Sequence, residues 1–301
     1  MKIDDIRKVL ILGSGTMGQQ IGILCAFHGY DVVLYDLKQE ILDNAFERIK
    51  RKAPKLAITY QFNAEQTQKA LSRISMSTNP EEAAMNVDII SESVPEDPKL
   101  KGKIFAQFHA ICDKNTIFTT NTSSLLPSQF ADACGRPEKL CALHFHDTTM
   151  TKVVDVMPHP GTSQETIELV TDFAERIGQI AIVLNKEHNG YVFNNMFMAL
   201  LDSALALASK NVTSVMEIDR AWMGVMHTMI GPFGLMDSVG IDTVYKITNY
   251  WAELLDHPQA KANAAFLKVY VDQGKLGLKT GEGFYTYPAP DYAKPTFVSG
   301  K

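Results

Sequence analysis

Cysteine is scarce in this chain of 301 residues, which contains only four. These residues show no Cys-x-x-Cys spacing, so we expect neither a disulfide framework nor a metal site. They are Cys25, Cys112, Cys134 and Cys141. A reduced, cytoplasmic setting is the default for such a chain.

The chain also lacks an excess of basic residues and long apolar runs. Its formal net charge of −5 argues against a nucleic-acid partner, which would require a basic face. No uninterrupted apolar run approaches the length of a bilayer span, and residues 1–10 are too charged for a signal peptide. We therefore expect a globular protein without a nucleic-acid or membrane partner, long enough for two domains.

Glycine, in contrast, occurs in an informative pattern near the N-terminus. An apolar stretch at residues 9–12 leads into Gly13-x-Gly15-x-x-Gly18, and a second apolar stretch follows at residues 30–35. In dinucleotide-binding proteins the first glycine permits a tight turn and the second lets backbone N–H groups approach a pyrophosphate. The third lets the helix lie close to its strand, and the helix directs its positive end at the phosphates.

A carboxylate closes the second apolar stretch. Asp36 lies 18 residues after Gly18, where it can bind both hydroxyls of an adenosine ribose. Because Asp36 would repel a 2′-phosphate, it favours NAD over NADP. The sequence therefore predicts an NAD site formed by Gly13, Gly15, Thr16, Met17, Gly18 and Asp36.

Strand-like apolar segments alternate with helical segments up to about residue 185. This alternation predicts an α/β fold with a Rossmann-like, doubly wound and mostly parallel sheet. From Asn194 the pattern is helical only, so we place the NAD-binding domain at residues 1–186 and an all-helical domain at 187–301. The broad apolar stripe of the helical domain must pack against the first domain or a second copy of the chain. We expect residues 291–301 to form a loose tail.

Proline interrupts one helical pattern of the first domain. A helix is predicted from about Leu37 to Arg51, Pro54 is expected to break it, and Asn63 begins another helix. A basic cluster in this region is either a solvated face or a site for a phosphate-rich tail. Its members are Lys50, Arg51, Lys52 and Lys55.

Ligands of open α/β sheets bind beyond the carboxyl ends of the strands. Polar side chains expected near such ends are Glu92, Ser123, His144 and His146. His144 leaves a buried strand toward the cofactor side, so it is the candidate base for an alcohol proton, with His146 as a weaker rival. A charged imidazole needs a supporting carboxylate, for which Asp155 is the best-placed candidate and Asp147 the alternative.

Five segments, in this order, resemble those of the L-3-hydroxyacyl-CoA dehydrogenases of the short monofunctional type. They are LILGSGTMG, NTSSL at 121–125, GYVFN ending at Asn194, GPFGLMDSVGIDT at 231–243 and KTGEGFY at 279–285. The resemblance covers about residues 6–287. It implies NAD-dependent interconversion of (S)-3-hydroxyacyl-CoA and 3-oxoacyl-CoA by a homodimer, with a cleft between an NAD domain and a helical dimerisation domain.

The resemblance also implies roles for single residues. His144 corresponds to the catalytic base, and Asp155 stands where the family has a glutamate. Ser123 matches the serine that binds the substrate oxygen, and Asn194 matches the asparagine near the reacting thioester. The remaining implied contacts are Glu96, Lys101 and Lys279 with the cofactor, and Lys50 and Lys52 with the CoA phosphates.

Three departures from the family pattern fall on the substrate side. The family's His-Phe-Phe-Asn-Pro is here His144-Phe-His-Asp-Thr, and the run from there to Asp155 is one residue shorter, with Asp in place of Glu. Pro54 interrupts the lysine-rich helix. Two further hypotheses therefore stand beside the first: an NAD-dependent dehydrogenase of a free 3-hydroxy acid, sugar acid or carnitine-like substrate, and a non-catalytic NAD-binding or structural relative.

Overall fold

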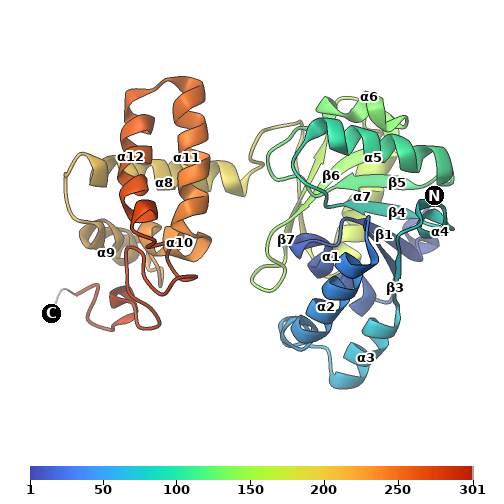
Figure 1. The fold of residues 1–301 in the computed structure, drawn as a ribbon, viewed down its shortest axis with the longest axis horizontal. Coiled ribbons are helices and arrows are strands. Elements are labelled where there is room, and N and C mark those ends of the chain that lie inside the picture. The colour runs from blue at the N-terminus through green and yellow to red at the C-terminus, as the bar shows by residue number, and fades with distance from the viewer. Residues whose placement is uncertain (300–301) are drawn as a thin grey trace. The chain divides into compact units, whose positions relative to one another are not determined.

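The computed structural model of the protein describes residues 1–299. The chain divides into two compact units, the first from Met1 to Val192 and the second beginning at Phe193 (Figure 1). Each unit has its own buried apolar core. Over the described residues, no helix combines the length and the apolar character that crossing a membrane requires.

The first unit is built around one sheet, whose strands within residues 1–299 follow the order β3-β2-β1-β4-β5-β6-β7-β8. Neighbouring strands run parallel except β6 and β7, which are antiparallel. The strands are β1 (Lys8–Leu12), β2 (Asp31–Tyr35), β3 (Ile74–Ser77), β4 (Ile89–Glu92), β5 (Ile117–Thr120), β6 (Leu140–Phe145), β7 (Val153–Pro158) and β8 (Ile180–Val183). The strand order reverses between β1 and β4, and the predicted doubly wound fold is confirmed.

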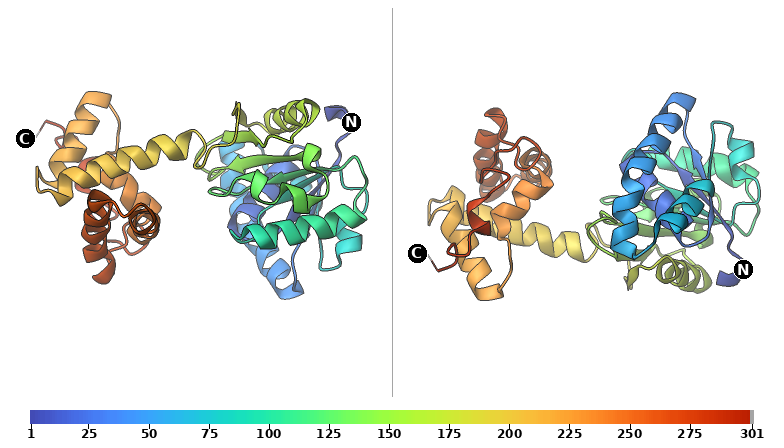
Figure 2. Two further views of the ribbon diagram at one scale, coloured as in Figure 1. Left: turned by 90° about the horizontal axis from the view of Figure 1, so that it is seen from above. Right: turned by 90° about the horizontal axis from the view of Figure 1, so that it is seen from below.

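Helices cover both faces of this sheet (Figure 2). They are α1 (Thr16–Phe27), α2 (Gln39–Tyr60), α3 (Ala64–Ser72), α4 (Pro80–Ala84), α5 (Pro98–Ile111), α6 (Ala131–Cys134) and α7 (Gln164–Arg176). Successive residues of a strand point to opposite faces, so Ile11 of β1 packs with Ile21 of α1 and Phe173 of α7. Its neighbour Leu10 packs on the other face with Phe105 of α5. Both faces are therefore buried, as a parallel sheet requires.

Helix α2 continues through Pro54, so the prediction that this proline breaks the helix is wrong. Proline has no N–H to donate to the carbonyl of Lys50, which costs about 3 kcal/mol in a helix interior. Apolar side chains are nevertheless buried on both sides of the proline, from Leu42 to Tyr60, and their burial outweighs that cost. The next predicted helix does begin after Asn63, whose side chain accepts a hydrogen bond from the backbone N–H of Gln66.

The second unit is mainly helical, as the sequence predicts. Its helices are α8 (Phe193–Ser209), α9 (Val215–Met226), α10 (Pro232–Val239), α11 (Ile241–Leu255) and α12 (Pro258–Asp272). Leu201, Phe233 and Leu267 belong to its core. The buried carboxylate of Asp219 accepts hydrogen bonds from the backbone N–H groups of Phe233 and Gly234, at 2.8 and 3.0 Å. This carboxylate thereby fixes the start of α10 against α9.

The C-terminal segment is not a loose tail over residues 291–299, so that expectation is wrong there; residues 300 and 301 lie outside the described residues. Phe297 is only 6% exposed and packs against Tyr285. Arg220 of α9 donates a hydrogen bond from Nε to the carbonyl oxygen of Phe297 at 2.9 Å. Burial of one aromatic ring offsets the entropy of ordering this polar segment.

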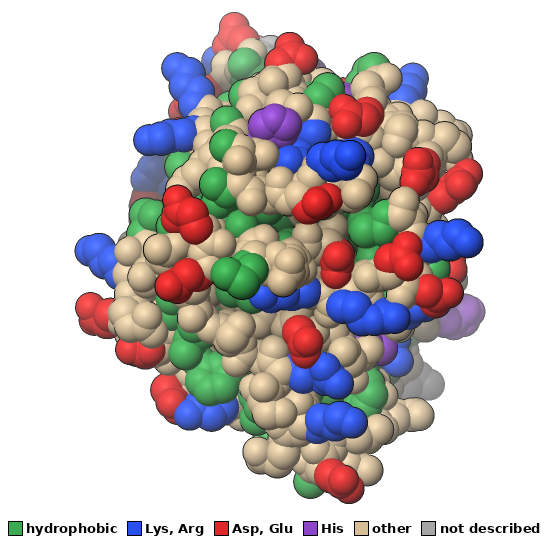
Figure 3. Space-filling model, turned by 90° about the vertical axis from the view of Figure 1, so that its right-hand side faces the viewer, with side chains coloured by type: hydrophobic (Ala, Val, Ile, Leu, Met, Phe, Trp, Pro, Cys, Tyr) green, Lys and Arg blue, Asp and Glu red, His purple; other side chains and the backbone are tan. Residues whose placement is uncertain are grey.

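Acidic and basic side chains are interspersed on the face of the first unit drawn in Figure 3. This distribution accords with a net charge of only −5 for the whole chain.

Candidate active site

The glycine turn between β1 and α1 has the geometry that the sequence predicts. Gly13 has a φ of +93°, and a Cβ there would lie 2.8 Å from the backbone oxygen of Ser93. A Cβ on Gly18 would lie 2.0 Å from the Gly13 oxygen. Above Gly15, in contrast, a Cβ would meet nothing within 4 Å. The turn is therefore tightly packed at Gly13 and Gly18. It is open at Gly15, the residue that caps α1, and a phosphate group fits there.

A cavity of about 840 Å³ extends from this turn along the end of β2. The Asp36 carboxylate lines it and accepts hydrogen bonds from the backbone N–H and the hydroxyl of Ser14, at 2.9 and 2.7 Å. Its other oxygen accepts from the N–H of Leu37 at 2.8 Å. Further lining residues are Tyr35, Ile41, Pro95, Leu100 and Ile104. An open helix N-terminus, a fixed carboxylate and apolar walls together fit the adenosine diphosphate part of a dinucleotide.

A second cavity, of about 410 Å³, shares Ser93 and Val94 with the first. The shared residues indicate that the two cavities form adjoining parts of one binding region. The second cavity is lined by many of the residues that the sequence predicts for the site, among them Thr16, Met17, Glu96, Lys101, Ser123, His144, His146 and Asp147. Residues assigned to cofactor contact and to chemistry thus lie around one space.

His144 lies near the end of β6 and is paired directly with Asp155 of β7 in the antiparallel register. The two side chains contact each other, with Nδ1 of His144 3.0 Å from Oδ2 of Asp155. The ring of Tyr191 stacks on His144 with a centroid distance of 4.4 Å. The carboxylate of Asp147, the alternative partner, instead accepts hydrogen bonds from the N–H and hydroxyl of Thr149.

Burial sets the protonation of this pair. Desolvation lowers the pKa of His144 below its ordinary value, and the hydrogen bond to Asp155 opposes this only in part. Burial alone would raise the pKa of Asp155, but hydrogen bonds from His144 and His146 outweigh it, so the pKa lies below its ordinary value. The pair therefore consists of a neutral imidazole and an ionised carboxylate near neutral pH, which is the state of a general base.

A second imidazole contacts the same carboxylate. Nε2 of His146 lies 3.3 Å from Oδ2 of Asp155, and the rings of His144 and His146 are 4.7 Å apart in an edge-on arrangement. Both imidazoles are therefore present at one carboxylate.

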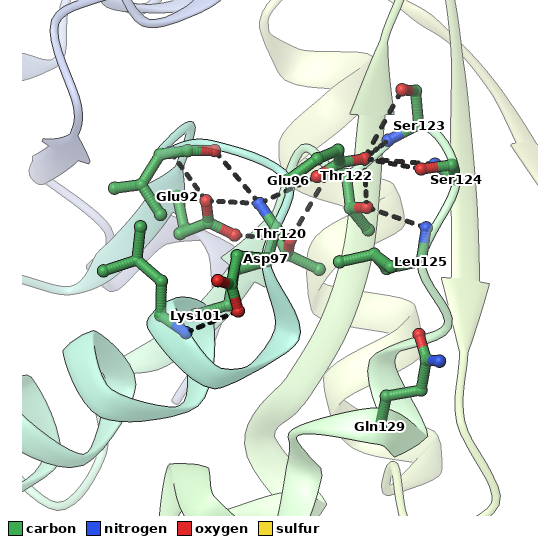
Figure 4. Close-up of polar contacts among 12 residues, drawn as sticks. Glu92, Glu96, Asp97, Lys101, Thr120, Thr122, Ser123, Ser124, Leu125 and Gln129 are labelled. Atoms are coloured by element: carbon green, nitrogen blue, oxygen red, sulfur yellow. Dashed lines mark hydrogen bonds and ion pairs between the residues drawn. The ribbon is translucent and has the colours of Figure 1, made fainter. Parts of the chain in front are cut away.

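Ser123 is positioned through Glu96 (Figure 4). Glu96 Oε1 accepts a hydrogen bond from the hydroxyl of Thr122 at 2.6 Å and from the backbone N–H groups of Ser123 and Ser124, at 2.9 and 3.2 Å. Burial alone would raise the pKa of Glu96, but these donors and the charge of Lys101 lower it. An ionised Glu96 therefore fixes the loop that carries Ser123 at the cavity wall.

Lys101 of α5 is almost completely buried, with 1% of its side chain exposed. Its ammonium lies 2.7 Å from Glu92 and 3.1 Å from Glu96, and it donates to the carbonyl oxygen of Val94 at 3.2 Å. Burial raises the pKa of Glu92 despite the neighbouring Lys101 charge. Through these contacts Lys101 fixes the loop between β4 and α5, a role that sequence reasoning did not identify.

Other predicted site residues lie in different surroundings. Asn194 is the second residue of α8 in the second unit, and Lys279 of that unit forms an ion pair with Asp242. In α2, Lys50 forms an ion pair with Glu47, and Lys52 is exposed.

Sequence reasoning did not assign a role to Tyr191, whose hydroxyl donates to the carbonyl oxygen of Thr122 at 2.5 Å. Its position in the GYVFN segment is the signal that could have identified it. Tyr191 therefore connects the ring of His144 to the loop that carries Ser123.

The glycine turn, the ribose-facing carboxylate and an adjoining His–Asp pair place the protein in the class of dinucleotide-dependent oxidoreductases. Family models match both units: one described as "3-hydroxyacyl-CoA dehydrogenase, NAD binding domain" matches residues 8–188, and one described as "3-hydroxyacyl-CoA dehydrogenase, C-terminal domain" matches residues 190–287. The chain therefore belongs to the 3-hydroxyacyl-CoA dehydrogenase family. The resemblance noted in the sequence and the NAD prediction are both confirmed.

Individual relatives agree with this assignment. The mitochondrial hydroxyacyl-coenzyme A dehydrogenase of Rattus norvegicus is 34% identical over 289 residues, covering 94% of this chain and 91% of that protein. The probable 3-hydroxybutyryl-CoA dehydrogenase of Bacillus subtilis is 30% identical over 285 residues, covering 94% and 98%. A solved diketoreductase structure, described by its dual catalysis of dicarbonyl compounds, is 37% identical with a TM-score of 0.87, covering 94% of this chain and 99% of that one.

Proposed function

We propose that the protein interconverts (S)-3-hydroxyacyl-CoA and 3-oxoacyl-CoA with NAD. The observation that carries this proposal is the buried contact of 3.0 Å between His144 and Asp155. It adjoins a cavity that also includes Thr16 and Met17 at the start of α1. The names of the relatives in rat and Bacillus subtilis support the acyl-CoA substrate.

His144 is the proposed base. With its Nδ1–H held by Asp155, the imidazole presents Nε2 as the acceptor for the hydroxyl proton of the substrate. When bound, NAD would supply the acceptor for the hydride that leaves the same carbon. As the imidazole becomes charged, Asp155 stabilises it. In the reverse direction His144 returns the proton to the oxygen.

Two further side chains are proposed to bind the substrate oxygens. The hydroxyl of Ser123 donates a hydrogen bond to the reacting oxygen, and the amide of Asn194 donates to the thioester carbonyl. Ser123 lines the same cavity as His144, which supports its part of the proposal. Lys50 and Lys52 are proposed contacts for the CoA phosphates, and Lys50 would first have to leave its ion pair with Glu47.

Glu96, Lys101 and Lys279 are proposed to act at the cofactor site. Glu96 and Lys101 line the same cavity as His144. Because Lys101 forms an ion pair with Glu96, it would act on the cofactor site indirectly, by holding the loop that carries Glu96. We also propose a homodimer formed through the helical unit. Large apolar side chains of that unit are exposed in the single chain, among them Met226, Met229, Tyr250 and Trp251.

A second candidate function is the reduction of dicarbonyl compounds that carry no CoA. The similarity to the diketoreductase structure favours it. So does the imidazole of His146 at the substrate cavity, where the related family pattern has Phe. A polar wall suits a substrate with a second oxygen near the reacting carbon.

The test compares turnover of 3-hydroxybutyryl-CoA, free 3-hydroxybutyrate and a dicarbonyl ester, followed by NADH absorbance. The proposal expects the thioester to be turned over best, whereas preference for either other compound would move the assignment to that class. His144→Ala should abolish turnover while NADH binding stays nearly unchanged. Strong NADH binding by the unmodified protein without turnover of any compound would instead indicate a non-catalytic relative.

A further inference from the structure

The proposed reaction needs one imidazole, but the site contains two. His144 lies in β6 and His146 directly follows its last residue, and both imidazoles contact the same carboxylate. The antiparallel register places Asp155 of β7 directly opposite His144. Two imidazoles and a carboxylate therefore converge from adjacent strands.

The spacing of these groups is that of metal ligands. Oδ2 of Asp155 lies 3.0 Å from Nδ1 of His144 and 3.3 Å from Nε2 of His146. One ligand atom from each of the three residues can be chosen so that all lie within 4.8 Å of one another. Two atoms bound tetrahedrally to zinc at about 2.0–2.1 Å are about 3.3 Å apart. The two separations from Oδ2 match neighbouring positions in such a coordination shell.

The second oxygen of the carboxylate points to the same conclusion. Asp155 is 1% exposed, and its Oδ1 has no hydrogen-bond donor among the residues that the structure describes. A buried carboxylate oxygen without a donor is costly, because it loses hydration and gains nothing in return. A cation bound at this carboxylate would compensate for that loss.

We propose that His144, His146 and Asp155 form a binding site for a divalent transition-metal ion, and that Zn²⁺ is the ion they fit best. Imidazole nitrogen and carboxylate oxygen are the zinc ligands in many three-residue sites. His144 and His146 both line the cavity of about 410 Å³, from which a water molecule would have to reach the ion as a further ligand. The cysteine spacing gave no sign of this site because none of its ligands is a cysteine.

Metal binding would also block the proposed reaction, and this part of the inference rests on the proposed function. A metal bound to Nδ1 of His144 displaces the proton that Asp155 holds, and that proton moves to Nε2. Nε2 then has no lone pair to accept a hydroxyl proton. The same residues thus form a base in the metal-free protein and an inhibitory site in the metal-bound one.

The test titrates ZnCl₂ into chelator-treated protein at near-neutral pH and follows the heat of binding. Unmodified protein should bind one ion per chain. His146→Phe removes one ligand and should weaken binding by more than about 100-fold, since loss of an outer-shell partner alone costs 10–100-fold. His188→Asn is the matched control, because it removes an exposed histidine elsewhere and should leave binding unchanged. Co²⁺ in place of Zn²⁺ should give visible absorption in unmodified protein and none in His146→Phe.

NADH binding and the melting temperature of His146→Phe show whether that variant is folded. Absence of stoichiometric Zn²⁺ binding, or equal binding by folded His146→Phe, would overturn the metal site. Zn²⁺ binding by a protein that turns over no substrate would support the metal site and reject the proposed function. Turnover that Zn²⁺ leaves unchanged at saturation would overturn the inhibitory part.

Discussion

Asp155→Asn is the most informative single substitution in this protein. The two side chains have nearly the same shape, so the packing of β7 is kept while the charge is lost. In the unmodified protein the carboxylate can only accept a hydrogen bond from Nδ1 of His144, at 3.0 Å. An amide can instead donate to Nδ1, which would place the ring proton on Nε2 and remove the base.

Two changes contribute to the loss of activity: the hydrogen bond to a charged carboxylate is lost, and the proton of the imidazole can move to Nε2. A hydrogen bond to a charged group contributes about 1.5–3 kcal/mol, which corresponds to a rate factor of roughly 10–150. If the tautomer also changes, the loss approaches the factor of about 10⁴ seen for the same substitution in a Ser–His–Asp triad. We therefore expect kcat to fall by between about tenfold and 10⁴-fold.

The assay measures kcat for the oxidation of 3-hydroxybutyryl-CoA by NAD, the direction in which His144 acts as the base, together with NADH affinity from a fluorescence titration. NADH affinity should change little, because Asp155 contacts the imidazoles rather than the glycine turn. Asp147→Asn provides the comparison, since that carboxylate contacts Thr149 and not His144. A kcat for Asp155→Asn within about threefold of the unmodified value, or a larger loss in Asp147→Asn, would refute the assigned pairing.

Three further predictions concern the cofactor, the pH dependence and the fold. Asp36→Ser should raise kcat/KM for NADPH relative to NADH by about tenfold or more, because Arg48 lines the same cavity and can meet a 2′-phosphate; an unchanged ratio contradicts it. His146→Phe removes a neighbour whose charge lowers the pKa of His144, so the acid limb of alcohol oxidation should move to higher pH, and a move to lower pH contradicts it. Pro54→Ala should raise the free energy of unfolding by about 1–3 kcal/mol in urea denaturation, and a decrease contradicts it.

The proline experiment has a matched control in the same unit. Pro98 lies in the first turn of α5, where a missing N–H leaves no helical hydrogen bond unmade. Pro98→Ala should therefore change the free energy of unfolding by no more than about 0.5 kcal/mol. A similar gain from both substitutions would show that the Pro54 effect is not due to its position inside the helix.

The cofactor half of the site was predictable because its signals are local. Gly13, Gly15 and Gly18 act through backbone geometry within one turn, and Asp36 directly follows the very next strand. The alternation of strands and helices was likewise enough to predict the doubly wound sheet. In each case the deciding interactions join residues close in sequence or repeat with a fixed period.

The catalytic half depends on contacts that the sequence does not fix. Asp147 and Asp155 both follow His144, and only the register of β6 against β7 decides which carboxylate contacts it. The shared carboxylate of His144 and His146 depends on the same register. The enclosed pair of Lys101 and Glu92 was missed because a lysine nine residues after a glutamate gives no sign of burial.

The two errors in the fold have a common cause. Pro54 and the polar segment around Phe297 were judged by local propensity, which predicts a break and a loose end. Burial of the α2 face and of the Phe297 ring instead decides the structure in both places. Propensity is thus overridden where tertiary packing contributes more than the local preference costs.

The antiparallel pair of β6 and β7 holds the catalytic base and its carboxylate, whereas the connection between the two strands lies at the substrate cavity. Buried Leu143 lies opposite Val156, and buried Phe145 lies opposite Val154, so the core holds the strands in place around the base and its carboxylate. The connection at residues 147–152 lies outside these pairs. Exchanges at Asp147, which lines the cavity, can reshape its rim without moving either reacting group, whereas the buried Thr148 is held by Gln20. A library of variants confined to this connection would therefore sample new substrates on an unchanged catalytic pair.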